Sequence, residues 1–221
     1  MVIDFHIHSK YSSDCFLESS RIIDMARRSC LDGLAIADHD TMAGVAEFKS
    51  LAPDLYIIPA QEITTRQGDI LGLFLKGQIE KRDDFQWNLR EIRLQGGLAV
   101  LAHPFKWPHL IRDRGFLRQF DAIEVFNARN NIPMPYLENF LASKAVSDYG
   151  LAFVAGSDAH EGFELGRAKA IFEFGREEAS DQKIKNAILE KRVKVSGSEV
   201  PLPLEIISHF SRNFRRLMPR Q

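Results

Sequence analysis

The chain has 221 residues, with 29 Lys and Arg against 30 Asp and Glu, a formal net charge of -1, and 45% hydrophobic residues. These values are typical of a globular chain with one large domain, and the near-neutral charge argues against stable binding of duplex nucleic acid. Two cysteines, Cys15 and Cys30, are too few for a disulfide framework. No secretion leader and no membrane-spanning segment is recognisable, so we expect a cytoplasmic protein.

Short apolar segments alternate with longer amphipathic segments along the chain. The predicted strands are Val2–Ile7, Leu34–Ala37, Leu55–Pro59, Ile70–Leu75, Leu98–Ala102, Ala122–Phe126, Leu151–Ala155 and Ala168–Phe174. The predicted helices are Glu18–Cys30, Thr41–Leu51, Asp83–Gln95, Pro135–Tyr149 and Ser180–Lys191. Such alternation predicts an α/β fold of parallel strands with helical crossovers, which is either a barrel or a doubly wound sheet.

The first predicted strand carries polar side chains at every second position. Asp4, His6 and His8 should therefore point to one face, with apolar residues on the other. Buried imidazoles and a buried carboxylate are costly unless water, hydrogen bonds or a metal ion satisfies them. Taken alone, this strand has a simpler interpretation, which is a solvated outer face.

Further polar residues follow the other predicted strands at their carboxyl ends. They are Asp38 and His39, Glu62, His103, Glu124 and Asn127, and Asp158 and His160. In a β/α barrel these ends share one mouth, where active sites are built, whereas a doubly wound sheet spreads them along an edge. The placement favours a barrel in which these residues are neighbours of His6 and His8.

Imidazoles mixed with carboxylates, without thiolates, are ligands that suit zinc, manganese or iron. The set is too large for one four-coordinate ion, so it predicts two or three divalent ions, with Glu62 as a plausible bridge. Each residue alone has an ordinary interpretation, as a helix cap or a hydrogen-bonded rim residue. The coincidence at successive strand ends favours metal binding.

Six motifs resemble the polymerase and histidinol phosphatase (PHP) family of metal-dependent phosphoesterases. They are DFHIHSKYSSD, IADHDTMAG, QEITT, LAHPF, IEVFNAR and GSDAH, and they occur in the family's order. The resemblance implies a distorted (β/α)7-type barrel, with a metal cluster at the C-terminal ends of its strands. We expect residues 1–221 to form one such domain, closed by a helix at about 203–218.

The resemblance also implies a ligand set. His6, His8, Glu62 and Asp158 would hold a first ion, Glu62 and His103 a second, and Asp14, His39 and His160 a third. Asp4, Asp38 and Glu124 would orient the ligand imidazoles, as metal-bound histidines require. The predicted catalytic residues are His6, His8, Glu62, His103, Asp158 and His160.

One position departs from the commonest family pattern. The segment GDILGLF places Asp69 where many relatives have a histidine. An aspartate could still bind the second ion, with a shorter reach and a preference for harder ions. Alternatively, Asp69 hydrogen-bonds a metal-bound water or caps the turn after Gly68.

The metal cluster predicts hydrolysis of a phosphate ester by a metal-bound hydroxide, because bound ions neutralise phosphate oxygens and activate water. A metal-dependent hydrolase of the amidohydrolase type and a non-catalytic metal-binding interaction module remain the alternatives. Lys106, Arg129 and Arg167 are candidates for holding a small phosphorylated substrate, with solvated rim charge as the other interpretation.

Two further segments bear on substrate and partners. PFKWPHLIRDRGFLR interleaves Phe105, Trp107 and Phe116 with basic residues, which suits stacking on a nucleotide or a short oligonucleotide but equally suits a helix packed on the barrel. In LEIISHFSRNFRRLM, apolar residues at helical spacing predict a helix that closes the barrel or contacts a second chain, with Arg212, Arg215 and Arg216 outside the apolar seam. We do not expect His109 or His209 to bind metal.

Overall fold

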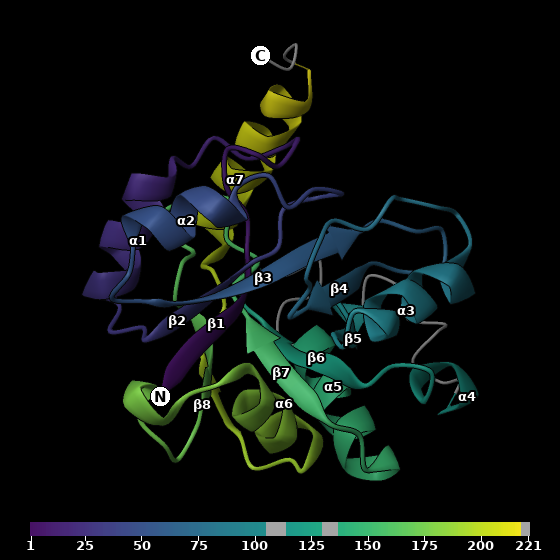
Figure 1. Cartoon of the computed structure of the whole chain (residues 1–221). Coiled ribbons are helices and arrows are strands. Elements are labelled where there is room, and N and C mark those ends of the chain that lie inside the picture. The colour runs from purple at the N-terminus through teal and green to yellow at the C-terminus, as the bar shows by residue number, and fades with distance from the viewer. Residues whose placement is uncertain (105–113, 130–136, 218–221) are drawn as a thin grey trace.

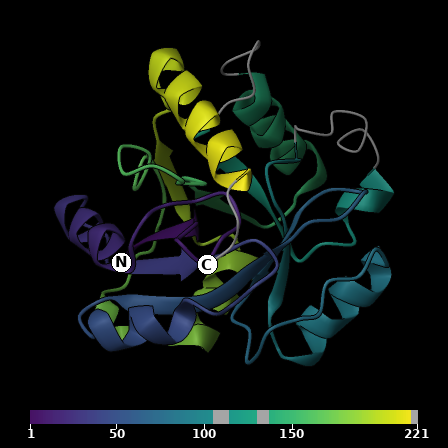
Figure 2. The ribbon, with the colours of Figure 1, turned by 90° about the horizontal axis from the view of Figure 1, so that it is seen from above.

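The computed structural model describes residues 1–104, 114–129 and 137–217. Within these residues one nine-stranded sheet, in the order β7-β6-β5-β4-β3-β2-β1-β8-β9, curls into a nearly closed barrel with helices packed around it (Figures 1 and 2). The strands are β1 (Val2–Ile7), β2 (Gly33–Ile36), β3 (Tyr56–Ile63), β4 (Ile70–Leu73), β5 (Leu98–Leu101), β6 (Ala122–Asn127), β7 (Phe153–Gly156), β8 (Ala168–Ile171) and β9 (Lys194–Gly197). The expected barrel class is therefore confirmed.

Apart from α4 (Arg114–Leu117), which the amphipathic pattern did not predict, the helices occur where it predicts them, with shifts of up to four residues at their ends. They are α1 (Ser19–Arg28), α2 (Val45–Leu51), α3 (Phe85–Leu94), α4 (Arg114–Leu117), α5 (Leu137–Tyr149), α6 (Asp181–Leu189) and α7 (Leu202–Arg216), with a short 3-10 turn at Arg176–Glu178. Side-chain caps explain two of the starts, because Asp84 accepts a hydrogen bond from Trp87 N and Ser180 accepts one from Lys183 N.

The expectation of parallel strands throughout is wrong for three strands. β1, β2 and β3 run parallel, as do β5, β6 and β7, but β4 is antiparallel to β3 and β5, and β8 and β9 are also antiparallel to their neighbours. The connection from β3 to β4, residues 64–69, is too short for a helical crossover. Reversal of β4 brings the start of that strand, rather than its end, to the barrel mouth.

The barrel interior is filled by alternate side chains from successive strands. Phe5, Ile58, Leu71 and Val154 belong to one buried cluster, and Ile184 of α6 joins them. This helix therefore closes the end of the barrel at which β1 begins, below the sheet in Figure 1. The opposite end, where β1 finishes, is the mouth.

The barrel is closed by direct contact between β1 and the segment that follows β7. Asp158 N donates to His6 O at 2.8 Å, and His8 N donates to Ala159 O at 3.0 Å. Gly156 makes this approach possible, since a Cβ at that position would lie 2.3 Å from the Cβ of His6. The two strands can meet only where one of them has no side chain.

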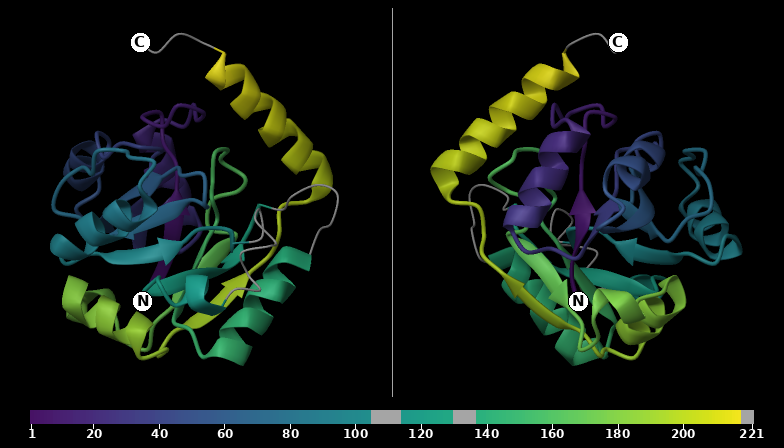
Figure 3. Two further views of the ribbon diagram at one scale, coloured as in Figure 1. Left: turned by 90° about the vertical axis from the view of Figure 1, so that its right-hand side faces the viewer. Right: turned by 60° about the vertical axis from the view of Figure 1, so that its left-hand side comes forward.

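The last helix, α7, leans over the mouth (Figure 3). Its buried residues are polar, so its polar face is the inward one. Val200 N donates to Ala128 O at 2.8 Å and anchors the start of the helix beside β6. Glu205 and Ser208 are buried, whereas the apolar seam is exposed, with 70% of Phe210 and 57% of Phe214 accessible. A helix is present at Leu202–Arg216, close to the expected range of about 203–218, but its apolar seam does not pack on the barrel. Contact with a second chain stays a prediction.

We predict that Gly156→Ala destabilises the protein by about 3 kcal/mol, because the added methyl group must push β1 away from β7. Gly77→Ala is the matched control, since a Cβ there meets nothing within 4 Å, and it should change stability by less than about 0.5 kcal/mol. Urea unfolding followed by circular dichroism measures both. Equal stability of the two variants would show that the close approach is not required.

The buried carboxyl of Glu205 leads us to predict a pH-dependent contribution to stability. Burial, reinforced by Glu164 and opposed by Arg129, raises its pKa from 4.5 to about 7. The folded state therefore binds this proton more tightly than the unfolded state, and the resulting stability is lost as the pH rises through about 4.5 to 7. We expect Glu205→Gln to gain on the order of 1 kcal/mol over the wild type between pH 5 and pH 8. Urea titrations in EDTA at both pH values test this, and a pH-independent difference would contradict it.

Candidate metal centre

Imidazoles and carboxylates gather at the barrel mouth. They come from the ends of β1, β2, β3 and β7 and from the loop that follows β5. The residues are His6, His8, Asp14, His39, Glu62, His103, Asp158 and His160. All of them are buried except His39, whose side chain is 16% exposed. Glu62 lies within β3, which continues beyond the predicted Pro59, and the others lie at strand ends or in loops.

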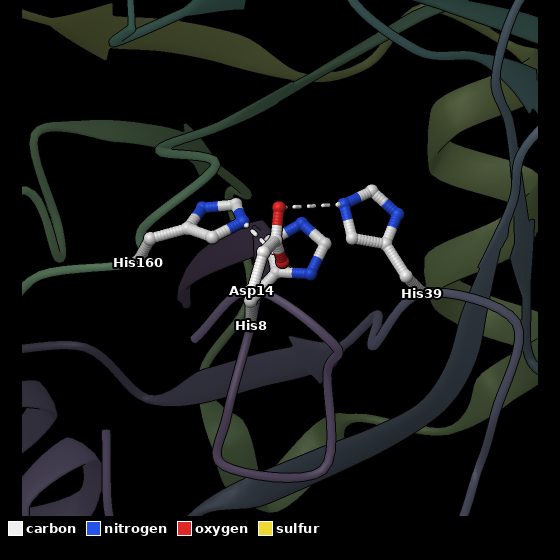
Figure 4. A group of neighbouring side chains, drawn as sticks. All are labelled: His8, Asp14, His39 and His160. Atoms are coloured by element: carbon white, nitrogen blue, oxygen red, sulfur yellow. Dashed lines mark hydrogen bonds and ion pairs between the residues drawn. The ribbon is translucent and has the colours of Figure 1, made fainter. Parts of the chain in front are cut away.

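Three groups of donor atoms lie close enough to hold ions, and they share members. His6, His8 and Asp158 form the first group, and His6 with Glu62 and His103 forms the second. The third consists of His8, Asp14, His39 and His160; in Figure 4 Asp14 lies between the rings of His39 and His160. The atoms in each group are within 4.8 Å of one another. His6 belongs to the first and second groups and His8 to the first and third, so the three groups form one contiguous centre.

The spacing of the donor atoms suits coordination of a metal ion better than hydrogen bonding between the side chains. Among the described residues Oε2 of Glu62 has no hydrogen-bond partner, yet it lies 3.3 Å from His6 Nε2, 3.2 Å from His8 Nε2 and 3.0 Å from Nδ1 of His39. Ligands about 2.1 Å from a tetrahedral or octahedral ion are about 3.0–3.4 Å apart. Buried donors that converge at this spacing without hydrogen-bond geometry are what an ion between them requires.

Backbone and side-chain partners hold the imidazoles in place. Glu124 connects two ligands, with Oε1 3.1 Å from His6 Nδ1 and Oε2 accepting from His103 N at 2.7 Å. Nδ1 of His8 lies 3.3 Å from Ser12 Oγ. Both arrangements leave Nε2 directed at the centre, which is the usual role of such partners around a metal. Ser12 was missed by the motif analysis, although it lies within the DFHIHSKYSSD segment.

The expected role of Asp4 and Asp38 needs correction. Asp4 accepts backbone N–H groups of Ser157 at 2.8 Å and Gly166 at 3.1 Å, and Asp38 accepts from the backbone and hydroxyl of Ser9. A register irregularity in β1 between Asp4 and Ile7 breaks the alternation that would have placed Asp4 beside the imidazoles. The two carboxylates position the loops that carry the ligands, rather than the ligand rings.

Buried charges at the centre shift the pKa values of its members. Burial lowers the pKa of His8, but the adjacent carboxylates of Asp158 and Glu62 outweigh it and raise the value to about 9. Burial also lowers the pKa of His6, but the negative charges of Asp158 and Glu124 outweigh this effect and raise the pKa. Neighbouring histidines hold the pKa of Glu62 below its ordinary value in spite of burial. Metal binding must therefore displace protons from the imidazoles, and it should weaken at acid pH.

Two of these residues also have an unusual backbone conformation. His103 has φ of 25° and Asp158 has φ of 54°, in the positive region that non-glycine residues rarely adopt. Asp158 N is held by His6 O, and His103 N is held by Glu124, so the surrounding bonds maintain these conformations. Strained backbone of this kind clusters at functional sites.

The basic residues expected to hold phosphate have different surroundings. Arg129 is buried, with Nη1 2.7 Å from His160 Nδ1. Arg167 donates to Phe163 O and to the hydroxyl of Ser198. Lys106 lies outside the described residues.

The aromatic segment that suggested nucleotide stacking is described only in part. Phe116 stacks on Phe85 at 5.3 Å between ring centroids and contacts Phe120 edge-on at 5.4 Å. This ring therefore belongs to the packing around α3, in agreement with the alternative interpretation of a helix packed on the barrel. Phe105, Trp107 and His109 lie outside the described residues.

Asp69 lies at the mouth because β4 is reversed. Its Oδ2 is 3.7 Å from His103 Nε2, and its side chain is 13% exposed. His103 Nε2 in turn lies 2.8 Å from Glu62 Oε1. Asp69 is therefore close enough to affect an ion held by the second group, although it is outside the three groups themselves.

A separate hollow of about 810 Å³ opens between α2, the start of β3 and α6. Its lining includes Met42, Tyr56 and Lys185, and it contains none of the converging imidazoles. We assign the functional site by donor chemistry to the mouth. None of the described helices is both long and apolar enough to cross a membrane.

Comparison with known sequences connects the chain to an established family. Residues 137–193 match a family model described as PHP-associated. Two uncharacterized proteins of Methanocaldococcus jannaschii are similar to the chain. One is 34% identical over 169 residues, covering 67% of this chain and 98% of the relative. The other is 31% identical over 183 residues, covering 78% and 70%.

Solved structures share the fold. A two-domain protein from Bacteroides vulgatus containing a predicted PHP-like metal-dependent phosphoesterase has a TM-score of 0.71 and 21% identity, covering 96% of this chain and 69% of that one. PsfC from Pseudomonas syringae also has a TM-score of 0.71, with 19% identity and coverage of 96% and 98%. An amidohydrolase from Chromobacterium violaceum with bound sulfate has a TM-score of 0.57 and 17% identity, covering 87% and 97%.

Fold and site together define an α/β barrel with a candidate metal centre at its mouth. The match to the PHP-associated model and the fold shared with a PHP-like structure support the PHP family assignment that the motifs indicate.

We predict that Asp69→His increases the zinc retained through purification, because an imidazole nitrogen suits zinc better than a carboxylate oxygen does. Added manganese should stimulate the wild type more than this variant, and Asp69→Asn should bind manganese more weakly than the wild type. Metal analysis of the three proteins, purified side by side, provides the measurement. Identical metal content and identical manganese response would make Asp69 a turn residue.

Proposed function

We propose that this protein is a metal-dependent phosphoesterase. The single observation that carries the proposal is the contiguous centre, in which three groups of buried donors share His6 and His8. A centre for several ions is suited to a substrate with several negatively charged oxygens, and phosphate esters are such substrates. Two solved structures of the same fold support this choice, since both are described as metal-dependent phosphoesterases and one of them as PHP-like.

The donor set determines which ions the centre suits. His6, His8, Asp158, Glu62 and His103 would hold two ions, and Asp14, His39 and His160 with His8 would hold a third; manganese, zinc and iron all accept such ligands. Divalent ions bound there would neutralise phosphate oxygens and lower the pKa of water at the centre.

The protein's own residues contribute position and charge balance. Glu124 holds the rings of the centre by binding His6 Nδ1 and the backbone of His103, so a phosphate meets donors that are already oriented. Asp14 Oδ1 lies 3.1 Å from His160 Nε2, and the buried guanidinium of Arg129 contacts the far side of the same imidazole. His160 is therefore held between an acidic and a basic partner, which fixes the orientation of its ring.

A hydrolase of the amidohydrolase type is the second candidate. The observation in its favour is the shared fold with the amidohydrolase from Chromobacterium violaceum. Nucleotides and short oligonucleotides are the substrates that we would screen first.

We predict that Asp158→Ala reduces hydrolysis of phosphate esters at least about 1000-fold, because it removes a buried ligand from the first group. Asp148→Ala is the matched control, since Asp148 is exposed and pairs with Lys144 on α5, and its rate should equal that of the wild type. EDTA should abolish activity, and manganese should restore it. Rates on mono- and oligonucleotides at matched metal content provide the measurement.

Three outcomes would reject the proposal. They are wild-type turnover by Asp158→Ala, activity that persists in EDTA, and hydrolysis of amides but not of phosphate esters. The last result would favour the second candidate. Metal binding without any hydrolysis would favour a non-catalytic module.

A further inference from the structure

The polar face of α7 carries three arginines to the barrel mouth. Arg212, Arg215 and Arg216 lie in the last turns of the helix, whose C-terminal end lies over the middle of the barrel in the view from above (Figure 2). Residues three and four apart share one helical face, so these three side chains are neighbours. The apolar seam occupies the opposite, exposed side.

Arg216 reaches the candidate metal centre itself. Its Nη2 donates to Oδ2 of Asp14 at 2.8 Å, although the two residues are separated by 202 positions in the chain. Asp14 is fully buried, while the side chain of Arg216 is 54% exposed, so the guanidinium extends inward from the rim. This contact positions the end of α7 beside the group formed by His8, Asp14, His39 and His160.

The other two arginines have donors without acceptors. Nε of Arg212 and Nε of Arg215 are both buried and have no hydrogen-bond partner among the described residues. The guanidinium carbon of Arg215 lies 4.9 Å from the ring of Phe16, in the loop that carries Asp14. A buried donor left without an acceptor costs about 1–3 kcal/mol, and the cost is removed when an anion accepts from it.

The charges around Arg212 also favour an added anion. Its pKa is lowered by burial and by the nearby guanidinium groups of Arg129 and Arg216. Arg129, Arg212 and Arg216 are cations that repel one another, and such a cluster attracts a ligand with several acceptor oxygens. The planar guanidinium fork matches phosphate oxygens in pairs, which an exposed lysine would not do.

We propose that Arg212, Arg215 and Arg216 form an anion-binding subsite that holds a second phosphate group of the substrate. The phosphate that is hydrolysed must lie at the metal centre, so the arginines above Asp14 contact a group one or more bonds away from it. The substrate class is therefore a phosphate ester with a second phosphate or phosphodiester. Only this assignment of the substrate depends on the proposed function, since the subsite itself can be tested without metal or turnover.

Binding of inorganic phosphate to metal-free protein is the first test. We expect saturable binding to the wild type at concentrations below about 10 mM, and a loss of affinity of about tenfold or more in Arg212→Gln/Arg215→Gln. Arg192→Gln/Lys194→Gln removes the same charge from exposed positions and should bind as the wild type does. Isothermal titration calorimetry measures affinity, and circular dichroism checks that each variant is folded.

Arg215→Lys provides a second variant in case the double substitution unfolds the protein. It keeps the positive charge but loses the paired donors, and we expect phosphate affinity to fall about threefold. The subsite is overturned if the wild type shows no saturable phosphate binding, or if the arginine variants and the control variant bind equally.

Turnover distinguishes the substrate assignment from the subsite. With manganese present, the arginine variant should have a KM about tenfold higher for 5′-phosphorylated dithymidylate, and a KM within about twofold of the wild type for thymidine 5′-monophosphate. An equal rise for both substrates would mean that the arginines hold the hydrolysed phosphate instead. If phosphate binds as expected and neither ester is hydrolysed by the wild type, the subsite stands and the proposed function fails.

Discussion

The close approach of β7 to β1 is the constraint on which the rest of the structure depends. Gly156 allows the backbone of β7 to lie against His6, and Asp158 N and His8 N then bond across the seam. The same contact that closes the barrel positions His6, His8 and Asp158, which form the first of the three donor groups. Closure of the barrel and assembly of the first donor group therefore depend on the same backbone contacts.

Because many ionisable groups are buried at the mouth, their charges must be balanced by nearby groups of opposite charge. Asp14, Glu62 and Asp158 are carboxylates with almost no access to solvent. Such groups are tolerated only beside cations, whether imidazolium, guanidinium or metal. Imidazoles supply part of this charge, and Arg216 supplies another part from the end of α7. The centre thus combines ligands that suit metal ions with organic cations that balance its buried carboxylates.

The position of α7 follows from its buried polar face rather than from its apolar seam. Glu205 and Ser208 lie against the barrel, and Val200 fixes the start of the helix beside Ala128. An amphipathic helix usually buries its apolar side, so hydropathy alone assigns the wrong face to the barrel. The inward face presents arginines to the mouth and leaves Phe210 and Phe214 exposed.

The sequence by itself determined the α/β class, the position of most elements and the chemistry of the ligands. Histidines and acids at strand ends are local features, and the motif around His6 and His8 is compact enough to be recognised. Only the tertiary structure decided that β4 is reversed, that Asp4 binds backbone groups and that Arg216 meets Asp14. These features depend on strand direction, a register irregularity and a contact across 202 positions. Periodicity reports which residues share a face, but not which distant segment that face will meet.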